Sequence, residues 1–83
     1  MDYKLIVPVN KVDGSKIENV TVKETFNGRD LKAIGNAGGE GSAMIALVAA
    51  ATGLSENTVL GMDARDIRKI GTMAKPFLAG GED

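Results

Sequence analysis

Apolar residues alternate with polar residues in the first quarter of the chain, and this period-two pattern predicts two β-strands. The alternating apolar positions are Tyr3, Leu5, Val7, Val9, Val20 and Val22. Asp13-Gly14 lies between the two stretches and favours a two-residue type I′ turn, which places Val7 opposite Val20 on one apolar face. Pro8 cannot donate a ladder hydrogen bond, so we expect the first strand to lie at an edge or to be interrupted there.

The longest apolar run is Ala43–Ala51, which has no polar side chain. A helix that is apolar on every side has to be covered on every side. At 1.5 Å per residue the run spans about 13 Å, much less than the roughly 30 Å of a bilayer core. It therefore predicts either a central core helix or a helix with one face left for another protein, and not a membrane span. Ser42 is the expected N-cap, and Gly53 is the expected end, in a Schellman motif.

Two shorter helices and a glycine-rich connector are predicted around this run. Arg29–Ile34 forms one or two helical turns. The segment Gly35–Gly41 is a flexible connector, because its glycines favour neither helix nor strand. Further along, Ser55 is positioned to cap a short helix that carries Val59 and Leu60.

The last helix is predicted to begin at Asp63, with Asp66 three residues later completing a start that resembles a capping box. Helical spacing divides the residues that follow into an apolar stripe and a basic side. The stripe is Ile67, Ile70 and Ala74, and the basic side carries Arg65, Arg68, Lys69 and Lys75. Pro76 is expected to end or kink the helix.

These elements predict an α+β fold, in which an N-terminal β-hairpin is followed by a flexible linker and a small bundle of about three helices. A chain of 83 residues forms one small domain with one core. That core is short of large side chains, because one tyrosine and two phenylalanines are its only aromatic residues. The expected parts are a β-hairpin unit at 1–26, a short helix and Gly-rich linker at 27–41, a helical unit at 42–79 and a disordered tail at 80–83.

The composition removes most catalytic chemistry. The chain has no cysteine and no histidine, which excludes disulfides, thiolate catalysis and the commonest metal ligand. Asp63 and Asp66 are the one close acidic pair in a predicted helical region, and helix capping accounts for both. The glycines before Ser42 lack the lysine and the preceding strand of a phosphate-binding loop. We therefore expect no enzyme activity, no cofactor, no metal and no small-molecule substrate.

The charge balance gives no reason to expect nucleic acid or an anionic membrane as a partner, because the net charge is -1. A helix-turn-helix DNA-binding regulator within residues 45–62 is nevertheless the alternative function. Ala49, Gly53, Val59 and Met62 have the spacing of that motif. Against it, the candidate recognition helix carries no Lys or Arg, and the residues that we expect it to expose are Glu56, Asn57 and Thr58.

Nearly the whole chain, from the first strand to about Phe77, carries short motifs whose order is more specific than any one of them. The motifs are Val7-Pro8-Val9, Ile17–Val22, Lys23-Glu24-Thr25, Gly28-Arg29-Asp30-Leu31, Leu47, Thr52-Gly53-Leu54-Ser55, Val59-Leu60, Met62-Asp63 and Asp66-Ile67. In this order they resemble the small tail assembly chaperone family of contractile-tailed, Mu-like bacteriophages and prophages.

The resemblance implies a non-catalytic protein that coats the helical tape measure protein and keeps it soluble until tail tube subunits polymerise around it. This role implies the host bacterial cytoplasm, and Met1 leads into charged residues rather than an apolar signal segment. Binding to amphipathic helices needs an apolar groove, and self-association is another way to cover apolar surface. The expected groove or self-association residues are Met44, Leu47, Val48, Leu60, Ile70 and Phe77, although a core would use the same six side chains.

Overall fold

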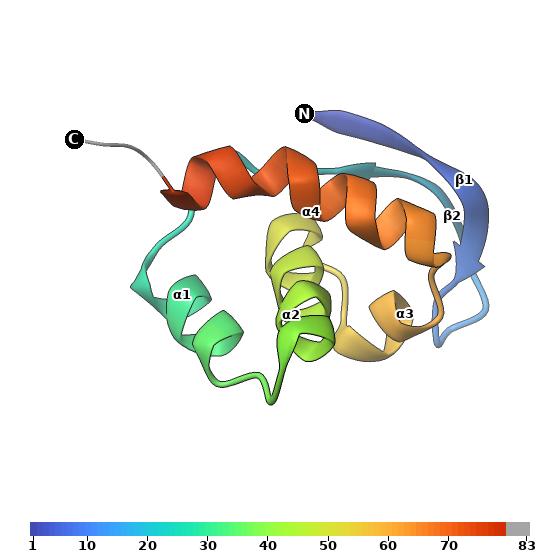
Figure 1. Cartoon of the computed structure of the whole chain (residues 1–83). Helices are drawn as coiled ribbons and strands as arrows, with labels where there is room; N and C mark the ends of the chain where they lie inside the picture. Colours follow the sequence, from blue (N-terminus) through green and yellow to red (C-terminus); the bar gives the residue numbers. More distant parts are fainter. Residues whose placement is uncertain (80–83) are drawn as a thin grey trace.

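A β-hairpin and a long helix enclose a central helix in the computed structural model, which describes residues 1–79 (Figure 1). The elements are β1 (Asp2–Asn10), β2 (Lys16–Thr21), α1 (Gly28–Gly35), α2 (Glu40–Thr52), α3 (Glu56–Leu60) and α4 (Ala64–Ala79). In Figure 1, α4 lies across one end of α2, and α1 and α3 lie on opposite sides of α2. The α+β prediction is confirmed, whereas the predicted tail at 80–83 lies outside the described residues.

The hairpin is antiparallel as predicted, but its register differs from the predicted one. Tyr3 pairs with Val20, and Val9 pairs with Ile17. Between these pairs β1 carries extra residues around Pro8, so the ladder is irregular from Lys4 to Val9. The pairing of Val7 with Val20 was therefore wrong, and Val7 is exposed rather than part of the apolar face. The prediction that β1 lies at an edge or is interrupted at Pro8 is confirmed, because β1 is an edge of a two-stranded sheet and its regular pairing is interrupted there.

The turn of the hairpin is wider than the two-residue loop predicted from Asp13-Gly14. The N–H of Lys11 donates to the carbonyl of Ser15, and the carboxylate of Asp13 accepts from the backbone N–H and the hydroxyl of Ser15. Gly14 has a φ of 90°, whereas Asp13 has no positive φ. A type I′ turn needs positive φ at both central residues, so the side chain of Asp13 organises a different loop.

The carboxylate of Asp66 joins α4 to the irregular part of β1. It is fully buried and accepts three hydrogen bonds, from Tyr3 Oη at 2.7 Å, Ile6 N at 2.9 Å and Val7 N at 3.1 Å. These donors supply the polar partners that a buried charge requires. Asp63 does cap α4, because its Oδ1 accepts from Arg65 N at 2.8 Å. The predicted capping role of Asp66 was wrong, since its side chain bonds to the hairpin instead.

Helix α2 occupies the centre of the domain, as its uniform hydrophobicity predicted. Ala46, Leu47, Val48 and Ala51 are buried, and the other residues of Ala43–Ala51 are half-buried. The helix begins at Glu40 with Gly39 as its N-cap, so the predicted N-cap at Ser42 was three residues late. It ends where expected, at Gly53, whose φ is 75°. The N–H of Gly53 donates to the carbonyl of Ala49, a simple left-handed cap rather than the predicted Schellman pair.

The shorter helices have the side-chain caps that such helices need. Asn27 and Asp30 form a capping box at the start of α1, and Ser55 Oγ accepts from Thr58 N at the start of α3. Lys23 also bonds to Asp30 at 2.8 Å, and this contact holds the pKa of the Asp30 carboxyl below its usual range. Helix α1 is thereby attached to the end of the hairpin.

Pro76 was expected to end or kink the last helix, and α4 does not end there, because it continues past Pro76 to Ala79. Proline removes the hydrogen bond to the carbonyl four residues earlier, here that of Thr72. Thr72 and Pro76 are both exposed, so water is available to that carbonyl, and only one turn of helix follows. The core lies between α4, α2, α3 and the hairpin; its buried members are Leu5, Val9, Val20, Val22, Leu47, Val48, Ala51, Val59, Met62, Ile67, Ile70 and Ala74.

We predict that Tyr3 titrates near pH 12. Burial, followed by the hydrogen bond to Asp66, raises the pKa of Tyr3 to about 12. Because the folded pKa lies above the unfolded value of about 10, this group stabilises the fold fully below pH 10, and the contribution is lost between pH 10 and 12. Tyrosinate absorbance measures Tyr3 alone, since the chain has one tyrosine and no tryptophan.

Asp66→Asn is the control for this titration, because it removes the charge beside the phenol and should move the midpoint part of the way back towards 10. Circular dichroism at each pH shows whether the helices persist. A wild-type midpoint near 10 with intact helices would contradict the buried Tyr3–Asp66 contact.

We also predict that Gly71→Ala stabilises the protein. A Cβ at Gly71 would lie 3.7 Å from Met44 Cγ and 3.9 Å from Leu47 Cδ2, which is ordinary contact between α4 and α2. Replacing a glycine inside a helix with alanine favours folding by about 0.5–1 kcal/mol. Thermal unfolding should show a rise of several degrees. Gly53→Ala is the matched control and should lower the midpoint, because Gly53 has a left-handed φ.

Candidate functional site

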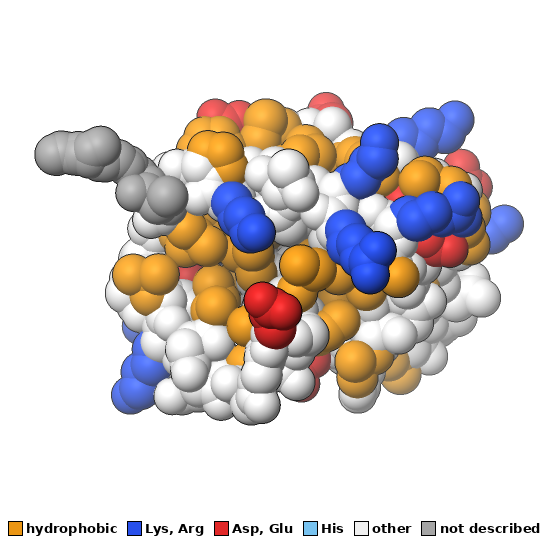
Figure 2. Space-filling model, in the orientation of Figure 1, with side chains coloured by type: hydrophobic (Ala, Val, Ile, Leu, Met, Phe, Trp, Pro, Cys, Tyr) orange, Lys and Arg blue, Asp and Glu red, His pale blue; other side chains and the backbone are white. Residues whose placement is uncertain are grey.

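An apolar groove lies between α1, α2 and α4 and has a volume of about 650 Å³. Figure 2 shows this face, where apolar side chains are exposed between α2 and α4. We call it the α1–α2–α4 groove; its lining residues are Ile34, Glu40, Gly41, Ala43, Met44, Ile45, Leu47, Ala64, Ile67, Arg68, Lys75 and Leu78. It is larger than the hollow that lies between α4 and β1.

The groove exists because the elements around α2 do not completely cover its apolar surface. Met44 and Ile45 are half-buried and line the groove. Helix α1 is short, has no buried residue and contributes only Ile34 to the lining. The connector from α1 to α2 contains Gly38 and Gly39, which have no side chain with which to cover α2. The remaining apolar surface therefore faces solvent.

Charged side chains stand at the edges of the groove. Arg68 and Lys75 of α4 line one edge, and Glu40 lies at the start of α2. All three are exposed, and none takes part in an ion pair among residues 1–79. By contrast, Arg65 lies 2.9 Å from Asp63, and this contact lowers the pKa of the Asp63 carboxyl. The charges at the groove are thus available to a partner.

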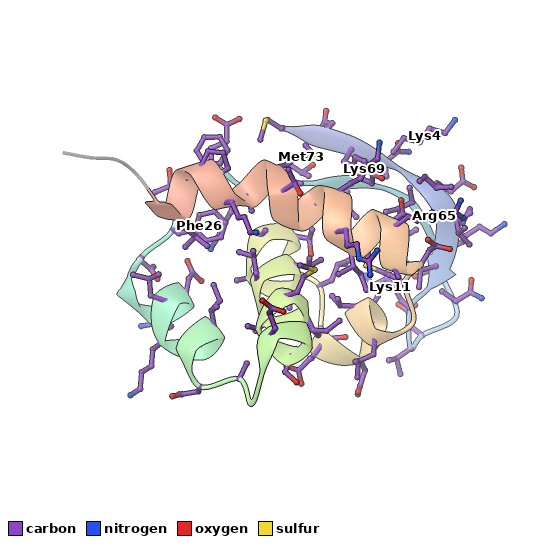
Figure 3. All side chains as sticks on the ribbon, in the orientation of Figure 1. Lys4, Lys11, Phe26, Arg65, Lys69 and Met73 are labelled. Carbon is purple, nitrogen blue, oxygen red and sulfur yellow. The ribbon has the colours of Figure 1, made fainter. Side chains whose placement is uncertain are left out.

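A second, more open hollow of about 470 Å³ lies where α4 meets β1. It is lined by Tyr3, Arg68, Lys69, Thr72 and Met73. Figure 3 shows Lys69 and Met73 on the side of α4 that faces the hairpin. This hollow is smaller, and only two of the lining residues have large, mainly apolar side chains, so the α1–α2–α4 groove is the better candidate for binding an apolar partner.

The structure brings two of the six predicted partner residues together in the groove, Met44 and Leu47. Val48 and Ile70 are fully buried and present no surface in this conformation. Leu60 is exposed, but it lies on α3 and lines neither hollow. Phe77 is half-buried on α4 and also lies outside both linings. The six side chains therefore do not form one surface.

Sequence reasoning missed several residues that line the groove, including Ile45 and Leu78. A usable signal was present in α4: Ile67 and Leu78 are eleven residues apart, which is three helical turns, so they lie on the same side. For Ile45 the sequence held no such signal, because all sides of Ala43–Ala51 are apolar.

The helix-turn-helix reading of residues 45–62 does not fit the observed helices. Helix α3 spans only Glu56–Leu60, about one and a half turns, which is short for a recognition helix. Thr58, which was expected to be exposed, is buried. The exposed residues of α3 are Glu56, Asn57 and Leu60, and they include no cation to meet a phosphate.

The structure also gives no support to the acidic pair or the glycine-rich segment as a site for catalysis or anion binding. Asp66 is buried and hydrogen-bonded to the hairpin, so it is closed to a substrate. The glycines before α2 lead into Glu40, whose negative charge in the first turn disfavours an anion there. Within residues 1–79, no group of three His, Cys, Asp or Glu side chains could hold a metal ion. No helix in this part of the chain is both long enough and apolar enough to cross a bilayer.

Comparison with known proteins identifies one relationship. A family model described as "Phage tail assembly chaperone proteins, E, or 41 or 14" matches residues 2–79. The match extends over every strand and helix, from the start of β1 to the end of α4. Searches of curated proteins and of solved structures gave no match.

Proposed function

This chain belongs to the phage tail assembly chaperone family, and from that premise we propose that it binds the tape measure protein and keeps it soluble before the tail tube polymerises. The protein acts by binding rather than by catalysis, in the cytoplasm of the host bacterium. The observation that carries the proposal is the α1–α2–α4 groove, which leaves the apolar side chains of α2 and α4 open to a partner.

The shape of the groove suits a helix. Its α4 side extends from Ala64 to Leu78, fourteen residue steps or about 21 Å at 1.5 Å per residue. A partner helix of about four turns would match this length. Helices that bind in grooves insert apolar side chains at intervals of three and four residues, and Met44, Ile45 and Ile67 provide the apolar surface for such a stripe.

The residues that line the groove are suited to binding many different helical segments of one long partner. Met44 lies in the lining beside branched aliphatic residues. Methionine is unbranched and polarizable, so it adapts to side chains of different shape. A chaperone that covers a long helical protein has to accept many related helical surfaces, and an adaptable apolar lining meets that requirement better than a rigid polar one.

We predict that wild-type protein increases the soluble fraction of a helical tape measure fragment from the same phage when the two are co-expressed, and that Met44→Glu removes this effect. Met44 is half-buried in the groove, so the new carboxylate would oppose an apolar partner helix. The cost of burying it should weaken binding at least about tenfold. Pull-down of the soluble fragment measures the complex directly.

Leu60→Glu is the matched control, because it places the same charge at an exposed leucine outside the groove. It should solubilise the fragment as well as wild type does. Circular dichroism of both variants must show wild-type helix content. Full activity of Met44→Glu would show that the groove is not the binding surface, and loss of activity in Leu60→Glu would assign the surface to α3 instead. Size measurements on the free protein test the separate prediction that copies self-associate.

A further inference from the structure

The exposed charged side chains of α4 are all basic. They are Arg65, Arg68, Lys69 and Lys75. The one acidic residue of the helix, Asp66, is buried against the hairpin. In Figure 2 the Lys and Arg side chains follow α4 beside the exposed apolar strip. Of these four, Arg68 and Lys75 line the groove, so its α4 side carries two cations although the chain as a whole has a net charge of -1.

Two of these cations are placed to act together on a bound helix. Arg68 and Lys75 both line the groove and are seven residues apart. Seven residues make almost two full turns, so the two side chains extend from the same side of α4, about 10.5 Å apart along its axis. Across the groove, Glu40 gives the start of α2 the opposite charge. The two sides of the groove therefore differ in charge.

We propose that the groove selects an amphipathic helix whose apolar stripe is bordered on one side by two acidic residues seven positions apart, which pair with Arg68 and Lys75. This inference rests on the proposed function, because it specifies the chemistry of the tape measure segments that the groove binds. Opposite charges across an interface favour encounter and set orientation. Glu40 strengthens the orientation, because it repels an acidic border placed against α2.

The same charges argue against a second copy of this chain as the occupant. Helix α4 is the longest amphipathic helix among residues 1–79, and its exposed charges are basic. Placed in the groove of another copy, its cations would lie near Arg68 and Lys75, and like charges in close contact disfavour binding. An acidic border on a different protein avoids this repulsion.

The test uses three labelled helix-forming peptides of eighteen residues with one shared leucine stripe. They differ only at two border positions seven apart, which carry Glu, Gln or Lys. Fluorescence anisotropy with the wild-type protein at low salt should give the order Glu, then Gln, then Lys, with about a tenfold difference in Kd between the Glu and Lys peptides, as expected for two exposed ion pairs. High salt should reduce this difference, because it screens exposed charges.

Three double variants test whether Arg68 and Lys75 cause the preference for the Glu peptide. Arg68→Glu/Lys75→Glu should reverse the order of the peptides, and Arg68→Gln/Lys75→Gln should abolish the preference while keeping the affinity for the Gln peptide. The matched control is Lys4→Glu/Lys69→Glu, which changes the net charge by the same amount outside the groove lining. Figure 3 shows both of its lysines at the hairpin side of α4. This control should keep the wild-type order.

The outcomes separate the two proposals. If the three peptides bind equally well and Met44→Glu weakens all of them, the groove binds helices but the charge preference is overturned. If the control variant reverses the order as Arg68→Glu/Lys75→Glu does, net charge rather than the groove edge is responsible, and the inference is again overturned. If no peptide binds, or Met44→Glu has no effect on binding, the groove itself is wrong as a helix-binding site and both proposals fail.

Discussion

The position of α4 depends on one buried interaction, the contact of the Asp66 carboxylate with β1. A buried carboxylate is costly unless several donors satisfy it, and Asp66 obtains three, from the Tyr3 hydroxyl and from the N–H groups of Ile6 and Val7. Both of these N–H groups lie in the stretch where β1 departs from regular pairing. The irregular strand and the charged residue therefore satisfy each other, and neither arrangement would be favourable alone.

This contact also determines where the groove lies. With its first turns attached to β1, α4 packs against α2 at Gly71, which lies beside Met44 and Leu47. The apolar residues of α4 have two different roles. Ile70 and Ala74 are buried in the core, whereas Ile67 and Leu78 also line the groove. The same helix thus stabilises the domain and supplies the cationic side chains that border the candidate binding surface.

The shortage of large side chains connects the stability of the domain with its proposed role. Helix α2 is apolar throughout, and a chain this small has few elements with which to cover it. The hairpin, α3 and α4 bury Leu47, Val48 and Ala51, while α1 and the glycines that follow it leave Met44 and Ile45 half-buried. Apolar surface that a domain does not cover is a common basis for binding another protein. Here it occurs in a chain that the family match assigns to tail assembly chaperones.

The comparison of prediction with structure shows which features local chemistry controls. Periodicity predicted the two strands, the α+β class and the central position of α2, because period and hydrophobicity are properties of the residues themselves. The left-handed end of α2 at Gly53 and the cap of α3 at Ser55 were also correct, since both depend on neighbouring backbone atoms. The order of short motifs resembled the chaperone family that the family match then showed.

Other features were decided only by contacts between distant segments. Asp66 looked like a capping residue because capping is a local role, whereas its partners Tyr3 and Val7 lie about sixty residues earlier. The hairpin register shifts in the same stretch of β1 that donates to Asp66, and the turn sequence alone did not predict that shift. Likewise, six candidate partner residues were chosen by hydrophobicity, and only packing separated the buried Val48 and Ile70 from Met44 in the groove. By itself the sequence determined the elements and the family, because those follow from residue types and their order. The tertiary structure decided the groove, because exposure depends on which surfaces the rest of the chain covers.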